Sequence, residues 1–153
     1  MAGHAAEVLD IRNQQLRDLY TYWQTMRGDS RIPPRSAFDP IRVPRLLPSL
    51  ILLDVEPDTR RLIVRLLGTR VATVYGRDYT GQYLDEVYFG SNARSVLDDY
   101  GTCAREGIPV LGERNFRNVR DVVYRMERLI LPLSDDGKEV NKLISGLHFI
   151  ELS

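Results

Sequence analysis

Tyrosines are concentrated in the middle of the chain, where their phenol groups could contact a ligand. Five of the eight tyrosines fall within residues 75–100, about a sixth of the 153-residue sequence: Tyr75, Tyr79, Tyr83, Tyr88 and Tyr100. A phenol offers a flat apolar ring together with a hydroxyl, and a buried hydroxyl needs a hydrogen-bond partner. We therefore expect some of these side chains to present their hydroxyls to a cavity.

Glu127 is a carboxylate in an otherwise apolar pattern. It shares the alternation phase of Leu129 and Leu133, so a strand would place all three on the same face. A carboxylate on such a face needs an ionic partner or a ligand. Two explanations stay open: Glu127 lies near an edge or pairs with an arginine such as Arg125 or Arg65, or it contacts a ligand. The candidate pocket residues are Tyr75, Tyr79, Tyr100, Glu127 and Leu129.

Catalytic and metal-binding patterns are not found. Only His4 and His148 could supply an imidazole, and no serine or cysteine has the glycine pattern of a nucleophile elbow. Cys103 falls within a predicted helix, where a buried, inert thiol is the usual role. No cysteine and histidine residues have zinc spacing. We predict no catalytic residue and no metal site.

The first predicted element is a helix from Glu7 to Arg27, a stretch without Gly or Pro. It carries an apolar stripe with heptad spacing, interrupted at Arg12. The stripe fits a helix laid on the sheet of its own chain, and it also fits a helix that pairs with a second copy. The residues of this apolar stripe are Leu9, Leu16, Leu19, Trp23 and Met26.

The rest of the chain predicts five strands and two further helices, which is an α+β architecture. Thr69 and Gly76 could cap the first of these helices at its two ends. The polar turns Pro57-Asp-Thr-Arg60 and Ser134-Asp-Asp-Gly137 predict a hairpin at each end of the sheet-forming region. The predicted strands are Ser49–Glu56, Arg61–Leu67, Val110–Val119, Val122–Leu133 and Val140–Ile150, and the predicted helices are Arg70–Tyr75 and Ser91–Glu106.

Composition limits the class of protein. A length of 153 residues with 43% hydrophobic residues is typical of a single globular domain. Lys plus Arg and Asp plus Glu both number 21, so no overall charge favours nucleic acid or a membrane surface. The single cysteine fits a reducing compartment, and no apolar run approaches the length of a bilayer span. We expect a cytoplasmic protein without nucleic-acid or membrane partners.

Several segments together resemble a family of bacterial stand-alone PAS-like domains. The resemblance spans nearly the whole chain, and it implies a five-stranded antiparallel sheet in the order 2-1-5-4-3 with helices on one face that enclose a pocket. It also implies that the extra N-terminal helix lies against the other face or across a dimer. We therefore assign residues 1–30 to this helix, with a role in packing or dimerisation, and residues 31–153 to the PAS-like domain. The segments are Leu19-Tyr-Thr-Tyr-Trp23, Phe38-Asp-Pro40, Leu46-Leu-Pro48, Leu52-Leu-Asp-Val-Glu56, Leu67-Gly-Thr-Arg-Val71, Tyr75-Gly-Arg-Asp-Tyr-Thr-Gly81 and Leu131-Pro-Leu-Ser-Asp-Asp-Gly137.

The known PAS cofactors are not predicted for this chain. The Asn-Cys-Arg-Phe type of loop that flavin photosensors carry is missing, and Cys103 has different neighbours. Haem commonly takes a histidine on the long helix, and Ser91–Glu106 contains none. We predict no resident cofactor and expect a small, uncoloured, non-covalent ligand between the tyrosine-bearing helices and the sheet.

A sensory or adaptor domain is the predicted function, with a small molecule or a protein as partner and no catalysis of its own. Pairing through flanking helices is a habit of the family, so we predict a homodimer through the apolar stripe. The signal would pass to a separate effector protein. Two alternatives stay open: an enzyme that uses Glu127 or a tyrosine as acid or base, and a protein-interaction scaffold whose pocket has collapsed.

Overall fold

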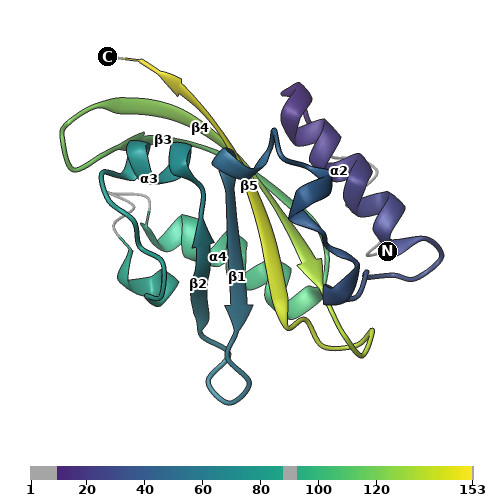
Figure 1. The fold of residues 1–153 in the computed structure, drawn as a ribbon. Coiled ribbons are helices and arrows are strands. Elements are labelled where there is room, and N and C mark those ends of the chain that lie inside the picture. Colours follow the sequence, from purple (N-terminus) through teal and green to yellow (C-terminus); the bar gives the residue numbers. More distant parts are fainter. Residues whose placement is uncertain (1–9, 88–92, 153) are drawn as a thin grey trace.

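The centre of the molecule is one antiparallel sheet of five strands. The structure is a computed structural model, and it describes residues 10–87 and 93–152. The strand order is β2-β1-β5-β4-β3, which confirms the predicted topology (Figure 1). Consecutive strands pair as hairpins in β1–β2, β3–β4 and β4–β5. The strands are β1 (Leu50–Val55), β2 (Leu62–Leu67), β3 (Val110–Arg117), β4 (Val123–Leu133) and β5 (Lys142–Glu151).

Helices cover both faces of this sheet. The helices α3 (Thr69–Tyr75) and α4 (Ala93–Glu106) and the 3-10 turn η4 (Leu84–Glu86) lie on what we call the inner face, and α2 (Gln14–Arg27) lies on the outer face (Figure 1). The predicted start of the long helix at Ser91 lies outside the described residues. None of the helices in the described ranges has both the length and the apolar character needed to cross a bilayer. The short turns that lead from α2 to β1 are η1 (Arg35–Ala37), η2 (Pro40–Arg42) and η3 (Leu47–Ser49).

Alternation along the strands divides the hydrophobic core into two layers. In β1, Ile51 and Leu53 belong to the inner layer, whereas Leu50 and Leu52 belong to the outer layer. The inner layer contains the side chains of α3 and α4, and the outer layer contains those of α2. The sheet is therefore buried on both faces over much of its area.

The apolar stripe of the N-terminal helix packs on the outer face of the sheet. Leu16, Leu19 and Trp23 are at most 2% exposed, and the Trp23 Nε1–H donates a hydrogen bond to the carbonyl oxygen of Pro132 at 2.9 Å. Met26 is only partly buried. Leu9 lies outside the described residues. Of the two arrangements open from the sequence, the structure has the helix laid on its own sheet, so a homodimer through the stripe would require α2 to leave that face.

The helix begins later than its composition predicts. The expected start at Glu7 falls outside the described residues, and residues 10–13 are not helical. Asn13 is the N-cap of α2, because its side-chain oxygen accepts a hydrogen bond from the Leu16 N–H at 3.0 Å. Such a side-chain acceptor satisfies one of the backbone donors left free at a helix start.

Gly68, rather than Thr69, occupies the N-cap position of α3. The predicted hydroxyl cap is wrong, since no side chain caps this helix. Gly68 lies against η3, and a Cβ atom there would be 2.4 Å from the carbonyl oxygens of both Leu47 and Pro48. At the other end Gly76 has a left-handed backbone with φ 93°, which ends the helix as predicted.

Candidate ligand groove

A groove of about 380 Å³ opens on the surface between β2, η4 and α4. We call it the α4 groove. Its volume is within the range of small-molecule sites, which begins at roughly 300 Å³. The lining residues are Arg60, Arg61, Leu62, Leu84, Asp85, Leu97, Gly101, Ala104 and Arg105.

The floor of the α4 groove is apolar because it is the edge of the inner core. Leu84 and Ala104 are buried members of that core, and Leu62 and Leu97 pack against it. Because Gly101 has no side chain, the lining at the middle of α4 is formed by backbone atoms. A ligand that covered this floor would remove apolar surface from water, which is the main source of affinity for small organic molecules.

Arg61 forms one wall of the α4 groove and is held by its neighbours. Its Nε and one terminal nitrogen donate to the two carboxylate oxygens of Asp85 at 3.0 and 2.7 Å. Its guanidinium also lies 3.5 Å from the centre of the Tyr83 ring. The hydrogen bonds from Arg61 lower the pKa of Asp85. The charge of Arg61 is thus largely matched inside the protein.

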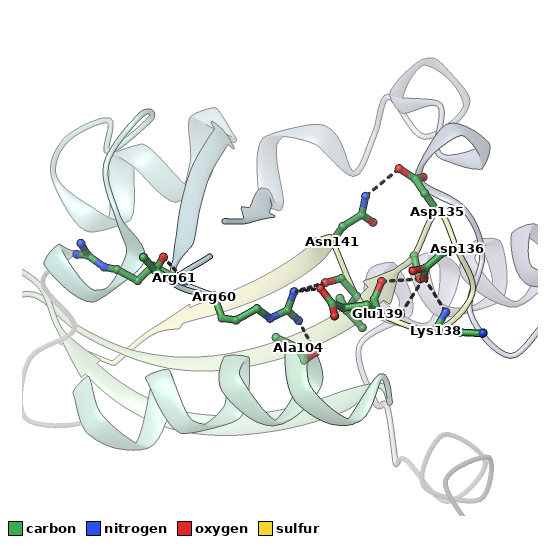
Figure 2. A network of polar contacts seen from close by, with 11 residues as sticks. Arg60, Arg61, Ala104, Asp135, Asp136, Lys138, Glu139 and Asn141 are labelled. Atoms are coloured by element: carbon green, nitrogen blue, oxygen red, sulfur yellow. Dashed lines mark hydrogen bonds and ion pairs between the residues drawn. The ribbon is translucent and has the colours of Figure 1, made fainter. Parts of the chain in front are cut away.

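Arg60 connects three separate segments at the other end of the α4 groove (Figure 2). It has a left-handed backbone with φ 59°, an uncommon conformation for a residue with a side chain. One terminal nitrogen donates to the Glu139 carboxylate at 3.2 Å and to the Val140 carbonyl at 3.0 Å. The other donates to the Ala104 carbonyl in the last turn of α4 at 3.3 Å. The β1–β2 turn, the end of α4 and the β4–β5 turn therefore meet at Arg60.

A second, more polar hollow adjoins the α4 groove and shares Arg60, Ala104 and Arg105 with it. We call it the basic hollow, and its other lining residues are Lys138, Glu139 and Val140. Arg105 is exposed, and its side chain makes no hydrogen bond or ion pair with any described residue. It is therefore available to an incoming group.

The β4–β5 turn, which borders the basic hollow, is held together by Asp136. One Asp136 carboxylate oxygen accepts hydrogen bonds from the backbone N–H groups of Lys138 and Glu139, each at 2.8 Å, and from the Ser134 hydroxyl at 2.9 Å (Figure 2). The same hydroxyl is 2.6 Å from the Glu139 carbonyl oxygen. These contacts fix the turn that carries Glu139 to Arg60.

We expect the Asp136 carboxyl to titrate with a pKa of about 2, below its ordinary 3.8, because the backbone N–H groups and the hydroxyl favour its charged form. Since the folded pKa is lower than the unfolded one, the stabilisation is complete above about pH 3.8 and is lost as the pH falls towards 2. Carbon-detected NMR titration measures this pKa. Asp136→Asn should remove this part of the acid sensitivity, and a measured pKa near the ordinary value would contradict the prediction.

Three of the predicted tyrosines, Tyr75, Tyr79 and Tyr100, lie together in the inner core. Tyr83 lies beside Arg61 instead, and Tyr88 lies outside the described residues. Tyr75 and Tyr100 are at most 1% exposed. The Tyr75 hydroxyl accepts a hydrogen bond from Arg128 at 3.0 Å, and burial raises the pKa of Tyr75 to about 12. The Tyr100 hydroxyl is 2.9 Å from the Ser145 hydroxyl, and the Arg128 guanidinium lies 5.2 Å from the Tyr100 ring centre. Tyr79 is also buried and contacts the edge of the Tyr75 ring.

Glu127 and Leu129 lie on the opposite side of the sheet from these tyrosines. Leu129 belongs to the outer core with α2, and Glu127 shares its face by alternation. Glu127 is half-buried and is paired in register with Glu113 and His148. The expectation that all five candidate residues line one pocket is therefore corrected: the structure brings the three tyrosines together and separates the other two from them.

Neither arginine considered as a partner for Glu127 contacts it. Arg125 forms its ion pair with Glu113, and Arg65 forms its ion pair with Asp54. The Glu127 side chain makes no hydrogen bond or ion pair within residues 10–87 and 93–152. Its half-exposed position lets water solvate the carboxylate, which is the reason no partner is needed.

Arg128 is the polar residue of the inner face that the sequence reasoning missed. It is 1% exposed and lies between α3 and α4. The sequence does contain a signal for Arg128, because it alternates along β4 with Tyr124, Met126 and Ile130. The structure buries all four side chains. An arginine within an apolar row is as unusual as a glutamate, and this row is the one that faces the helices.

Within the described residues, the remaining candidates for chemistry lie on different elements, Cys103 on α4 and His148 on β5. Cys103 is fully buried, and burial raises the pKa of its thiol well above the ordinary value, which disfavours the reactive thiolate. His148 is on β5 beside Glu127. His4 lies outside the described residues. In the part of the chain that the structure describes, no three His, Cys, Asp or Glu side chains are grouped as a metal site would require.

Comparison with known proteins agrees with this architecture. A family model described as PAS domain matches residues 11–148. The chain therefore belongs to the PAS domain family. The match also includes α2, so the outer-face helix lies within the region that the family model describes. Among curated proteins, no sequence match was found.

Solved structures with the same fold come from several kinds of protein. VqmA bound to DPO has a TM-score of 0.57 at 12% identity, over 74% of this chain and 57% of that one. The light state of the blue-light photoreceptor Aureochrome1 LOV has a TM-score of 0.53 at 9% identity, over 73% and 87%. Cycle PAS-B from Drosophila melanogaster with bound ethylene glycol has a TM-score of 0.51 at 12% identity, over 66% and 98%. At these identities the likeness concerns the fold alone.

Proposed function

We propose that this chain is a sensory or adaptor PAS domain that binds a small molecule in the α4 groove, without covalent attachment, and signals to a separate protein. The observation that carries the proposal is the apolar floor formed by Leu62, Leu84, Leu97 and Ala104 in an open groove on the helix-covered face. A concave apolar surface with a few charged groups at its rim is the usual form of a small-molecule site.

A route for the signal supports the proposal. Arg60 lines the α4 groove, and its guanidinium donates hydrogen bonds to Glu139 and Val140 in the β4–β5 turn. That turn is bonded to the chain after α2, because the Ser134 N–H donates to the Pro33 carbonyl at 3.0 Å. The same hairpin accepts the hydrogen bond of Trp23 at Pro132. A ligand that displaced Arg60 would thus act on α2, provided that the bound and free states differ in these contacts.

The proposal includes the absence of catalysis, a bacterial signalling context and a cytoplasmic location. The burial of Cys103, which disfavours its reactive thiolate, supports a binding role over an enzymatic one. The single cysteine supports a reducing compartment. Assembly as a homodimer stays a prediction, and while α2 lies on the sheet it would have to use surface other than Leu16, Leu19 and Trp23.

A protein-interaction scaffold is the second candidate, and one observation favours it. The space between the two helices and the inner face is occupied by Tyr75, Tyr100 and Arg128, all nearly inaccessible to solvent. Their mutual contacts make this part of the core a packed unit rather than a site for a buried ligand. In that case the partner would be another protein and the α4 groove would bind no small molecule.

We expect Gly101→Leu to abolish ligand binding while it raises the free energy of unfolding by about 0.5–1 kcal/mol, because leucine is the better helix former. A Cβ at Gly101 meets only the Arg105 guanidinium, 2.7 Å away at the end of a flexible side chain, which can move. The larger side chain would then fill the middle of the groove. NMR screening with a mixed library of small acids, amines and alcohols measures the binding, and urea denaturation measures the stability.

Gly101→Ala is the matched control, since it brings the gain in helix propensity without filling the groove. Wild-type protein and Gly101→Ala should both show shifted amide signals for Leu62, Leu84 and Leu97 with the same compounds. Shifts that persist in Gly101→Leu, or that lie away from the α4 groove, would contradict the proposed site. A wild-type protein that binds none of the library would favour the scaffold.

A further inference from the structure

We infer that the ligand of the α4 groove is a small organic anion with an apolar tail. The inference rests on the proposed function and names the chemical class of its ligand. The tail would lie on the apolar floor of the α4 groove, and the anionic head would lie in the basic hollow. The linings of the two cavities share Arg60, Ala104 and Arg105, which places the cavities side by side and within reach of one extended molecule.

The two adjacent cavities differ in chemistry. Away from the shared residues, the α4 groove is lined by Leu62, Leu84, Leu97 and Gly101, together with Arg61 and Asp85, whose charges are paired with each other. The basic hollow has none of these leucines, and its additional side chains are Lys138, Glu139 and Val140. A molecule that is uniformly apolar or uniformly charged would match only one cavity. An amphipathic ligand matches both.

The charge of the basic hollow favours a negative head group. Arg60, Arg105 and Lys138 supply three positive charges, and Glu139 supplies one negative charge. Glu139 is bonded to Arg60 at 3.2 Å. Arg105 and Lys138 therefore stay as excess positive charge around the hollow, and a carboxylate between them would gain two charge-assisted contacts.

Arg105 is the residue that we expect to bind the head group directly. Arg61 lines the α4 groove as well, but Asp85 already accepts two of its hydrogen bonds. Arg60 donates to Glu139, Val140 and Ala104. Arg105 has no such partner among the described residues, so binding an anion there breaks no existing contact.

Octanoate and 1-octanol test this inference, because they share a similar tail and differ in charge at the head. Titration by NMR should give a lower Kd for octanoate, with shifts at both Leu97 and Val140, and this Kd should rise with salt. Arg105→Gln should weaken octanoate by about fivefold, the equivalent of one partly exposed ion pair, and should leave 1-octanol unchanged. Arg94→Gln, an exposed arginine at the start of α4, should change neither.

The outcomes separate this inference from the proposed function. If 1-octanol binds as tightly as octanoate, or Arg105→Gln and Arg94→Gln act alike, the anionic class is wrong while the groove stays a ligand site. If octanoate binds and Gly101→Leu does not reduce its binding, the site itself is wrong. If octanoate fails to bind while neutral or cationic members of the library bind the groove, the inference is overturned and the proposed function is retained.

Discussion

Replacing Trp23 by alanine is expected to lower the free energy of unfolding by about 3–5 kcal/mol, the usual range for removing a buried aromatic side chain. Trp23 is 2% exposed within the outer core. The change would leave a cavity between α2 and the sheet and would leave the Pro132 carbonyl without its indole donor. Urea denaturation of the purified variant measures the loss.

The Trp23→Ala variant also tests whether the apolar stripe packs on the sheet of its own chain or forms a dimer interface. Because Trp23 packs on its own sheet, the assembly state measured by light scattering should be the same before and after the substitution, as far as the variant stays folded. Trp23→Phe is the matched control, since it keeps a ring in the core and loses the indole N–H, and it should cost only about 1–2 kcal/mol. A loss below 1 kcal/mol for alanine, or a dimer that dissociates in the folded phenylalanine variant, would contradict this assignment.

Replacing Gly68 by alanine is expected to cost about 3 kcal/mol, at the upper end of the usual penalty for overpacking. The new methyl group would meet the backbone carbonyls of Leu47 and Pro48 at 2.4 Å. Backbone atoms cannot rotate away as a side chain can, so η3 or the start of α3 would have to move. The hydrogen bond from the Gly68 N–H to the Leu50 carbonyl, 2.8 Å long, would be strained at the same time.

Gly101→Ala is an informative comparison within the same chain. Its Cβ would also meet an atom at a short distance, but that atom belongs to the flexible Arg105 side chain. We therefore expect opposite signs, with Gly68→Ala destabilising and Gly101→Ala slightly stabilising. Thermal denaturation of the two variants under one set of conditions decides the point. A neutral Gly68→Ala would mean that η3 does not pack as closely against α3 as described.

Much of the fold could be predicted from the sequence, because its signals are local. The turn residues Pro57-Asp-Thr-Arg60 and Ser134-Asp-Asp-Gly137 mark the two predicted hairpins, and Gly76 marks the end of α3. The spacing of Leu16, Leu19 and Trp23 defines one face of a helix. These features depend on backbone conformation and on residues a few positions apart, so they can be derived without knowing what lies across the sheet.

The sequence did not show which face of β4 meets the tyrosine-bearing helices. Alternation shows that Glu127 and Leu129 share one face of β4 and that Met126 and Arg128 share the other. It does not show which face meets the tyrosine-bearing helices, because β4 is apolar and buried on both sides over most of its length. The assignment of Glu127 to the pocket followed the wrong row, and only the packing of α2 on one face and of α3 and α4 on the other distinguishes the two.

The sequence by itself determined the class of fold, the hairpins and the helical stripe, since each depends on periodicity or on a short turn. The tertiary structure alone decided that the stripe covers the outer face, that Arg128 rather than Glu127 lies among the tyrosines, and that Arg60 and Arg105 border one groove. Arg60 and Arg105 are 45 positions apart in the sequence. No local pattern records such a distance, because the groove forms only where the β1–β2 turn, η4 and the end of α4 pack against the same edge of the core.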